Sequence, residues 1–158
     1  MTEIPKIVLG TYQMPDYESL RRIVACALDA GVSSFDTAPS YGTEGMLGRA
    51  LKETTQDRES FFCSNKIDAI QMYHGNIKEH VEQRLRLMDI GYFDLLLIHW
   101  PLEQYMVNTW KQMQELKAEG KVKAIGICNA RVRHLEHFAK MGIVPDYVQD
   151  ERHPLNTC

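Results

Sequence analysis

The chain has 158 residues, of which 44% are hydrophobic and 25% are charged. These fractions are typical of a soluble globular protein and exclude a disordered chain or a coiled coil. Lys and Arg number 18 against 21 for Asp and Glu, and the net charge of -3 argues against binding to nucleic acid or to an anionic membrane. The length predicts one domain over residues 1–158, yet a complete eight-stranded βα barrel typically needs about 250 residues.

The cysteines and the N-terminus predict a reduced, cytoplasmic protein. The four cysteines are far apart and form no C-x-x-C pair, so neither a zinc site nor a redox dithiol is predicted. The first residues lack the basic start and apolar run of a signal peptide. No stretch approaches the roughly 18 apolar residues that a membrane span requires. We therefore expect no metal and no membrane contact.

Two hydrophobic periodicities alternate along the chain. Short apolar runs predict strands at residues 7–9, 32–36, 61–64, 93–98, 122–128 and 147–148. Between them, apolar residues recur at helical spacing and predict five helices. Their buried faces are expected at Leu20, Ile23, Val24, Ala27 and Leu28, at Met46, Leu47, Ala50 and Leu51, at Ile77, Val81, Leu85 and Met88, at Met106, Trp110, Met113 and Leu116, and at Val132, Leu135, Phe138 and Ala139. Asp16 and Asn76 are the expected N-caps of the first and third helices, and Gly31 is expected just past the end of the first.

This alternation predicts an α/β fold made of right-handed parallel βα units. Two architectures fit it, a doubly wound open sheet and part of a βα barrel. No G-x-G-x-x-G follows the first strand, and no G-x-x-x-x-G-K-[ST] occurs in the chain. Because these signatures usually mark nucleotide-binding open sheets, their absence favours the barrel without excluding the open sheet.

Polar residues gather at one end of the predicted strands. Each follows or ends a strand at its carboxyl end, which is the end where βα-barrel enzymes assemble their active sites. The residues are Asp36, Tyr41, Lys66, His99, Asn129, Gln149, Glu151 and His153. Their positions favour a catalytic site over an ordinary set of solvated loops.

Four of these residues suit the protonation of a carbonyl oxygen. A nearby lysine ammonium is expected to stabilise the Tyr41 phenolate and lower its pKa, and Asp36 is expected to keep the proton on Lys66. A neutral His99, donating from one ring nitrogen, can orient a substrate carbonyl. None of the side chains gathered there is redox-active, so a hydride has to come from a cofactor.

Several stretches in chain order resemble the N-terminal part of the aldo/keto reductases, which are NADP(H)-dependent reductases built on a TIM barrel. They are Leu9-Gly10-Thr11-Tyr12, Phe35-Asp36-Thr37-Ala38 with Tyr41-Gly42 and Glu44, Leu47-Gly48-x-Ala50-Leu51, Ser64-Asn65-Lys66, 94–101 (DLLLIHWP), 120–126 (GKVKAIG) with Asn129, and Gln149-x-Glu151-x-His153-Pro154. Together they cover residues 9–154. The resemblance implies an incomplete TIM (β/α)8 barrel of about six strands.

The resemblance also implies roles for particular residues. Tyr41 corresponds to the general acid, Lys66 and Asp36 to the pair that tunes it, and His99 to the residue that positions the carbonyl. Asn129 and Gln149 correspond to residues that hold the nicotinamide carboxamide. Tyr12 and Trp100 correspond to aromatic residues of the substrate pocket. The implied reaction is the reduction of a small aldehyde or ketone to an alcohol by hydride from NADPH.

Two departures from the family pattern qualify this expectation. Cys128 stands where the family commonly has a serine. The chain also stops at Cys158, before the region in which the family completes its barrel and grips the cofactor phosphates. A second hypothesis is therefore a catalytically inactive partial barrel that acts as an oligomeric or binding module and self-associates through exposed sheet edges. A metal-dependent hydrolase ranks behind both.

Two further clusters are interpreted without a catalytic role. His134 and His137 are expected on the solvent face of a helix. Met106, Trp110 and Met113 are expected to form a helix-packing stripe.

Overall fold

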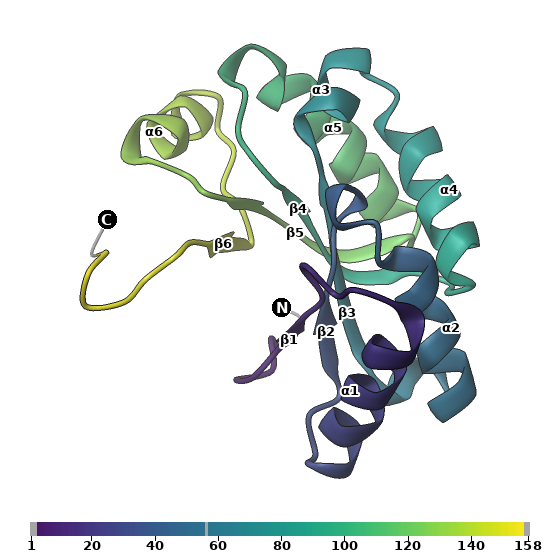
Figure 1. The fold of residues 1–158 in the computed structure, drawn as a ribbon. Coiled ribbons are helices and arrows are strands. Elements are labelled where there is room, and N and C mark those ends of the chain that lie inside the picture. Colours follow the sequence, from purple (N-terminus) through teal and green to yellow (C-terminus); the bar gives the residue numbers. More distant parts are fainter. Residues whose placement is uncertain (1–2, 56, 157–158) are drawn as a thin grey trace.

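Six parallel strands form a single sheet in sequential order, β1-β2-β3-β4-β5-β6 (Figure 1). The structure is a computed structural model that describes residues 3–55 and 57–156. Met1, Thr2, Gln56, Thr157 and Cys158 lie outside the described residues. The strands are β1 Leu9–Gly10, β2 Ser34–Asp36, β3 Phe62–Ile67, β4 Phe93–Ile98, β5 Val122–Cys128 and β6 Tyr147–Gln149.

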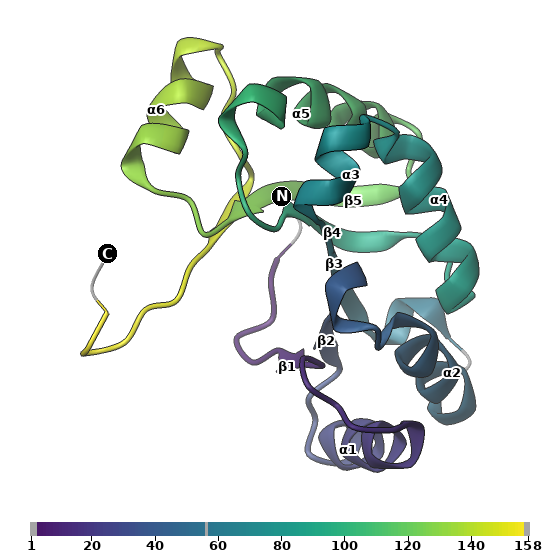
Figure 2. The same cartoon turned by 45° about the horizontal axis from the view of Figure 1, so that its top comes forward.

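Helices cover the outer side of this sheet, which curls into an arc (Figure 2). They are α1 Tyr17–Asp29, α2 Glu44–Thr54, α3 Ala69–His74, α4 Ile77–Met88, α5 Glu103–Ala118 and α6 Val132–Lys140, with 3-10 turns η1 Pro39–Tyr41 and η2 Arg58–Ser60. Sequential parallel strands curled under one layer of helices are the architecture of a βα barrel. The predicted α/β partial barrel of about six strands is confirmed, and the open doubly wound sheet is wrong.

The apolar residues divide between the two faces of the sheet. The larger cluster lies between strands and helices, with Phe35, Cys63, Leu96 and Ile127 among the strand residues. A smaller inner cluster contains Phe62, Leu95, Leu97, Ala124 and Cys128. Because side chains alternate along a strand, the neighbours of the outward residues point into the arc. This alternation determines which polar side chains reach the inner face.

The three predicted helix-end residues lie at their predicted positions. Asp16 caps α1, since its side chain accepts a 2.8 Å hydrogen bond from the Ser19 backbone N–H. Gly31 follows with φ of 79°, a left-handed conformation that favours glycine. Asn76 lies at the predicted N-cap position of α4, but its side chain makes no capping hydrogen bond. Gln112 Oε1 of α5 accepts from the Ile77 backbone N–H at 3.1 Å in its place.

The prediction of a solvent-facing His134 is also wrong. His134 is buried in the first turn of α6, where its Nδ1 accepts a 3.1 Å hydrogen bond from the Arg131 backbone N–H. Burial, with help from the charge of Arg133, lowers the pKa of His134. His134 therefore stabilises the start of α6. The three-residue spacing of His134 and His137 does not by itself show whether a histidine is buried or exposed.

Strands β1 and β6 lie at the two edges of the sheet. In the part of the chain that the structure describes, β1 pairs with β2 and β6 pairs with β5. No helix in the described part of the chain is long and apolar enough to cross a membrane. The cytoplasmic location stays a prediction from the sequence.

Candidate active site

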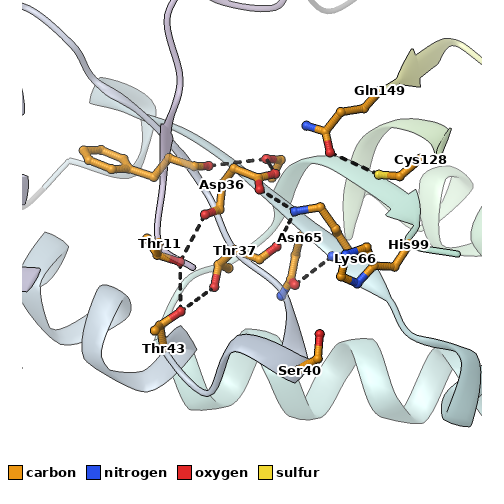
Figure 3. A network of polar contacts seen from close by, with 12 residues as sticks. Thr11, Asp36, Thr37, Ser40, Thr43, Asn65, Lys66, His99, Cys128 and Gln149 are labelled. Atoms are coloured by element: carbon orange, nitrogen blue, oxygen red, sulfur yellow. Dashed lines mark hydrogen bonds and ion pairs between the residues drawn. The ribbon is translucent and has the colours of Figure 1, made fainter. Parts of the chain in front are cut away.

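Asp36, Tyr41, Lys66 and His99 come together at the carboxyl end of the sheet. Lys66 Nζ forms an ion pair with Asp36 and lies 4.9 Å from the centre of the Tyr41 ring. The Tyr41 and His99 rings meet edge to face with centroids 5.6 Å apart. Figure 3 shows the Asp36 and Lys66 side chains reaching toward each other across β2 and β3. Four residues that span 64 positions of the sequence thus form one cluster.

Strand register explains the convergence of Asp36 and Lys66. Asp36 is the last residue of β2 and pairs with Ser64 of β3. Phe35 and Cys63 belong to the outer core, so Asp36, Ser64 and Lys66 point into the arc. The Ser64 hydroxyl donates a 2.6 Å hydrogen bond to Asp36 Oδ1, which orients the carboxylate toward Lys66.

Lys66 is a buried ammonium with a matched set of acceptors. Its side chain is 2% exposed, and Nζ donates to the Asp36 carboxylate and, at 3.1 Å, to the Thr37 carbonyl. Burial alone would lower the pKa of Lys66, but the Asp36 carboxylate outweighs it and leaves the pKa above the usual value. The positive charge on Lys66 is therefore maintained at neutral pH, in the direction predicted from the sequence.

The predicted lowering of the Tyr41 pKa is wrong. Burial raises the pKa of Tyr41 and outweighs the opposing effect of the Lys66 ammonium. Tyr41 lies half-buried at the end of η1, where its ring also contacts Tyr12 with centroids 5.0 Å apart. The phenol therefore holds its proton firmly at neutral pH, as a proton donor must, while Lys66 stands beside it to stabilise the phenolate.

Asp68 is a site residue that the sequence analysis missed. It follows β3 and contacts His99 through a hydrogen bond between the carboxylate and ring Nδ1. The backbone N–H of Ser40 donates to the other carboxylate oxygen at 2.8 Å. Asp68 precedes the short helix α3, which was also not predicted, because only Met72 of its six residues is buried. The carboxylate next to an apolar strand was the one signal available.

Tyr12 and Trp100 each contact one ring of the cluster. Tyr12 packs against Tyr41, and Trp100 stacks on His99 with centroids 6.0 Å apart. The two residues remain 62% and 57% exposed, so both offer aromatic surface to a ligand. Their predicted place around a substrate is consistent with this arrangement and stays a prediction.

Asn129 and Gln149 lie on the β5 and β6 side of the same end. Asn129 has a φ of 53° and donates from Nδ2 to the His99 carbonyl at 2.8 Å. Gln149 Oε1 accepts a 3.1 Å hydrogen bond from Cys128 Sγ. Among the described residues these bonds leave Asn129 Oδ1 as an acceptor and Gln149 Nε2 as a donor. That pair is complementary to a primary carboxamide.

Three buried threonines form a hydrogen-bonded network next to the cluster. The Thr11 hydroxyl donates to the Asp36 carbonyl at 3.1 Å, and the Thr43 hydroxyl lies 2.8 Å from that of Thr11 and 3.1 Å from that of Thr37 (Figure 3). The network joins the end of β1, the β2 exit and the start of α2. It fixes the loop that carries Tyr41.

Glu44 and Asn65 form a second support behind the sheet. Asn65 donates from Nδ2 to Glu44 Oε1 at 2.7 Å, and its Oδ1 accepts from the Lys66 backbone N–H at 2.7 Å. Burial raises the pKa of Glu44, against the opposing effects of Asn65 and Arg84. These contacts explain the Glu44 and Asn65 positions of the sequence motifs as scaffolding for Lys66.

A cavity of about 600 Å³ opens beside His99 and Trp100. Its lining includes Gln71, His80 and Arg84, and one buried polar atom of each lacks a hydrogen-bond partner within the described ranges. Burial lowers the pKa of His80 to about 4, so that ring is neutral at pH 7. No group of three or more potential metal ligands was found in the part of the chain that the structure describes.

A buried lysine, carboxylate, tyrosine and histidine at the carboxyl end of a βα arc define a candidate oxidoreductase site. The pattern of the Aldo/keto reductase family matches residues 6–157, so the chain belongs to that family. It is 36% identical over 155 residues to the methylglyoxal reductase DkgA of Escherichia coli strain K12, an alignment that covers 96% of this chain and 55% of that protein. It is 32% identical over 157 residues to the oxidoreductase YtbE of Bacillus subtilis strain 168, which is described as uncharacterized, with 96% and 56% covered.

Solved structures agree with this assignment. An aldo/keto reductase from Brucella melitensis superimposes with a TM-score of 0.89 at 31% identity, covering 98% of this chain and 60% of that one. The aldo-keto reductase MGS-M4 from a deep-sea metagenome superimposes with a TM-score of 0.87 at 33% identity, covering 96% and 56%. The chain thus spans slightly more than half the length of the relatives it matches.

Proposed function

We propose that this chain carries the catalytic half of a nicotinamide-dependent reductase that converts an aldehyde or ketone to an alcohol. The observation that supports this proposal most strongly is the contact of a protonated Tyr41 with a buried, charged Lys66. A carbonyl oxygen gains negative charge as its carbon accepts a hydride, and it then needs a proton. Tyr41 supplies that proton from its hydroxyl, and Lys66 stabilises the phenolate that remains.

Asp36 and His99 have supporting roles in this proposal. Asp36 keeps Lys66 charged, because the ion pair offsets the cost of burying the ammonium. His99 lies edge-on to Tyr41, next to the place proposed for the reacting oxygen beside the phenol. Tyr12 and Trp100 cover the remaining faces of the substrate with aromatic surface.

The residues on β5 and β6 fit one end of a nicotinamide cofactor, proposed to be NADPH. Asn129 Oδ1 and Gln149 Nε2 offer the acceptor and donor that the carboxamide requires. When bound, the reduced nicotinamide supplies the hydride that no side chain of the protein can supply. The printed name of the Escherichia coli relative, methylglyoxal reductase, suggests a small carbonyl compound such as methylglyoxal as the first substrate to test.

Titration of the purified chain with NADPH tests the cofactor proposal. Binding is expected to change the cofactor fluorescence and to raise the melting temperature. Gln149→Leu is expected to raise Kd about tenfold, because one lost hydrogen bond of about 1.4 kcal/mol corresponds to that factor. Gln83→Leu, which alters an exposed glutamine of α4, is the matched control and should bind as the wild type does. If addition of NADPH to the wild-type chain changes neither the cofactor fluorescence nor the melting temperature, the cofactor proposal is contradicted.

The open sheet edges support a second proposal for the 158-residue chain, which is self-association as an oligomeric or binding module. Within the described residues, strands β1 and β6 form the two edges of the sheet, and Val148 of β6 is 45% exposed. Sedimentation velocity at rising protein concentration is expected to show dimers or larger species. A single monomeric boundary at all concentrations would count against this proposal.

A further inference from the structure

The inner carboxyl end of the sheet contains a contact that the proposed reaction does not explain. Asp68 Oδ1 is hydrogen-bonded to Nδ1 of His99. The same carboxyl group accepts from Ser40 twice, from the backbone N–H at 2.8 Å and from the hydroxyl at 3.2 Å. Asp68 therefore links the loop that carries Tyr41 to the residue that follows β4.

Helix capping does not explain the position of Asp68. It is the residue before α3, where an aspartate usually accepts a hydrogen bond from the first helical N–H groups. Its side chain makes no such bond. Instead both carboxylate oxygens are used by Ser40 and His99, so the residue serves the site and not the helix.

The charge on Asp68 determines which nitrogen of His99 carries a proton. Burial raises the pKa of Asp68, but the hydrogen bonds from His99 and Ser40 outweigh it and leave the pKa below the usual value. Asp68 is therefore ionised at neutral pH and can only accept hydrogen bonds. The Nδ1 atom of His99 must then be the donor, and a neutral imidazole has no second N–H to offer.

We propose that Asp68 is a positioning residue that holds the proton of neutral His99 on Nδ1 and makes Nε2 a hydrogen-bond acceptor. The consequence for catalysis rests on the proposed function. In this form, Nε2 of neutral His99 accepts a hydrogen bond from a hydroxyl group, either that of Tyr41 or that of the alcohol product. It donates to a carbonyl oxygen only when the ring carries a second proton. This replaces the sequence expectation of a neutral His99 that donates to the carbonyl.

The surroundings of His99 contain few other groups that could set its tautomer. Tyr41 of η1 faces the ring edge-on, and Trp100 stacks on it. His80 and Arg84 of α4 line the same cavity, and Arg84 Nη1 is paired with Glu44 at 3.3 Å. Of the charged groups in the described chain, only Asp68 is hydrogen-bonded to the His99 ring.

Long-range nitrogen–proton NMR of the imidazole rings tests the proposal in the chain without cofactor or substrate. The spectrum distinguishes a ring protonated on Nδ1 from one protonated on Nε2, and His99→Gln identifies the signals by removing them. Neutral His99 is expected in the Nδ1–H form. A neutral ring protonated on Nε2 would overturn the proposal, whether or not any variant folds.

Variants of Asp68 show whether this residue is the cause. In Asp68→Asn the side-chain oxygen can still accept the hydrogen bond from the Ser40 backbone N–H. The amide NH2 then points toward Nδ1 of His99 and donates to it. Neutral His99 is therefore expected to switch to the Nε2–H form. Asp68→Glu restores a carboxylate and is expected to recover the Nδ1–H form. Asp57→Asn, at the equivalent capping position before η2, is the matched control and should leave His99 unchanged.

An unchanged tautomer in a folded Asp68→Asn chain would also overturn the proposal. These readouts need neither cofactor nor turnover. A chain that fails to reduce carbonyl compounds but shows the tautomer switch would contradict the proposed function alone.

Discussion

Replacement of Tyr41 by Phe is expected to lower the rate of carbonyl reduction by roughly 100- to 10,000-fold, the usual contribution of a positioned general acid. The change removes the hydroxyl that donates the proton and leaves the ring packed against Tyr12 and His99. Binding of the cofactor should change little, because the substitution leaves Asn129 and Gln149 in place. The measurement is the initial rate of NADPH consumption with a saturating small aldehyde.

Tyr12→Phe is the matched control for this substitution. Tyr12 lies 5.0 Å from Tyr41, ring centre to ring centre, but it has no contact with Lys66 among those found in the structure. Loss of its hydroxyl is expected to leave the rate close to that of the wild type. Equal rates for wild type and Tyr41→Phe, with both chains folded, would remove Tyr41 from the role of proton donor.

Replacement of Gly48 by Ala is expected to destabilise the fold by about 3 kcal/mol, the upper end of what overpacking usually costs. Gly48 is buried where α2 crosses α4, and a Cβ there would lie 2.3 Å from the Met88 carbonyl oxygen and 2.6 Å from its Cα. Backbone atoms of a packed helix cannot rotate away as a side chain can, so the two helices must separate. The melting temperature of a chain of this size should fall by roughly 6 to 12 °C.

Gly45→Ala in the same helix is the control for helix propensity. A Cβ at Gly45 would meet only the flexible end of Leu87, at 3.4 Å. Because alanine favours helix by up to about 1 kcal/mol over glycine, this variant is expected to be as stable as the wild type or more so. If the two variants melt at the same temperature, the close α2–α4 crossing is not what requires glycine at Gly48.

The sequence predicted the architecture well because strand and helix periods alternate clearly. The continuous apolar run of β4, for example, marks a strand covered on both faces. Boundaries were less accurate. Lys66 lies inside β3 and not after it, because β3 continues to Ile67. Helix α3 was not predicted, because a helix of six residues with one buried side chain has no apolar periodicity to recognise.

The site was only partly predictable, since residue types do not reveal the balance of opposing forces. The motif placed Tyr41 beside Lys66, but only the structure shows that burial outweighs the ammonium in setting the Tyr41 pKa. Asp68 lies 31 positions from His99, and no periodicity in the sequence connects the two. The threonine network likewise depends on three loops that meet only in the folded chain.

Hydride transfer is tested most directly with NADPH deuterated at the nicotinamide C4 position. The chain is incubated with this cofactor and a small aldehyde such as methylglyoxal, and the product is analysed by mass spectrometry. One deuterium on the new carbinol carbon is the predicted result, and its amount should fall with Tyr41→Phe. Alcohol formed without deuterium, or no alcohol from a folded chain that binds the cofactor, would contradict the assignment of this site as a carbonyl reductase.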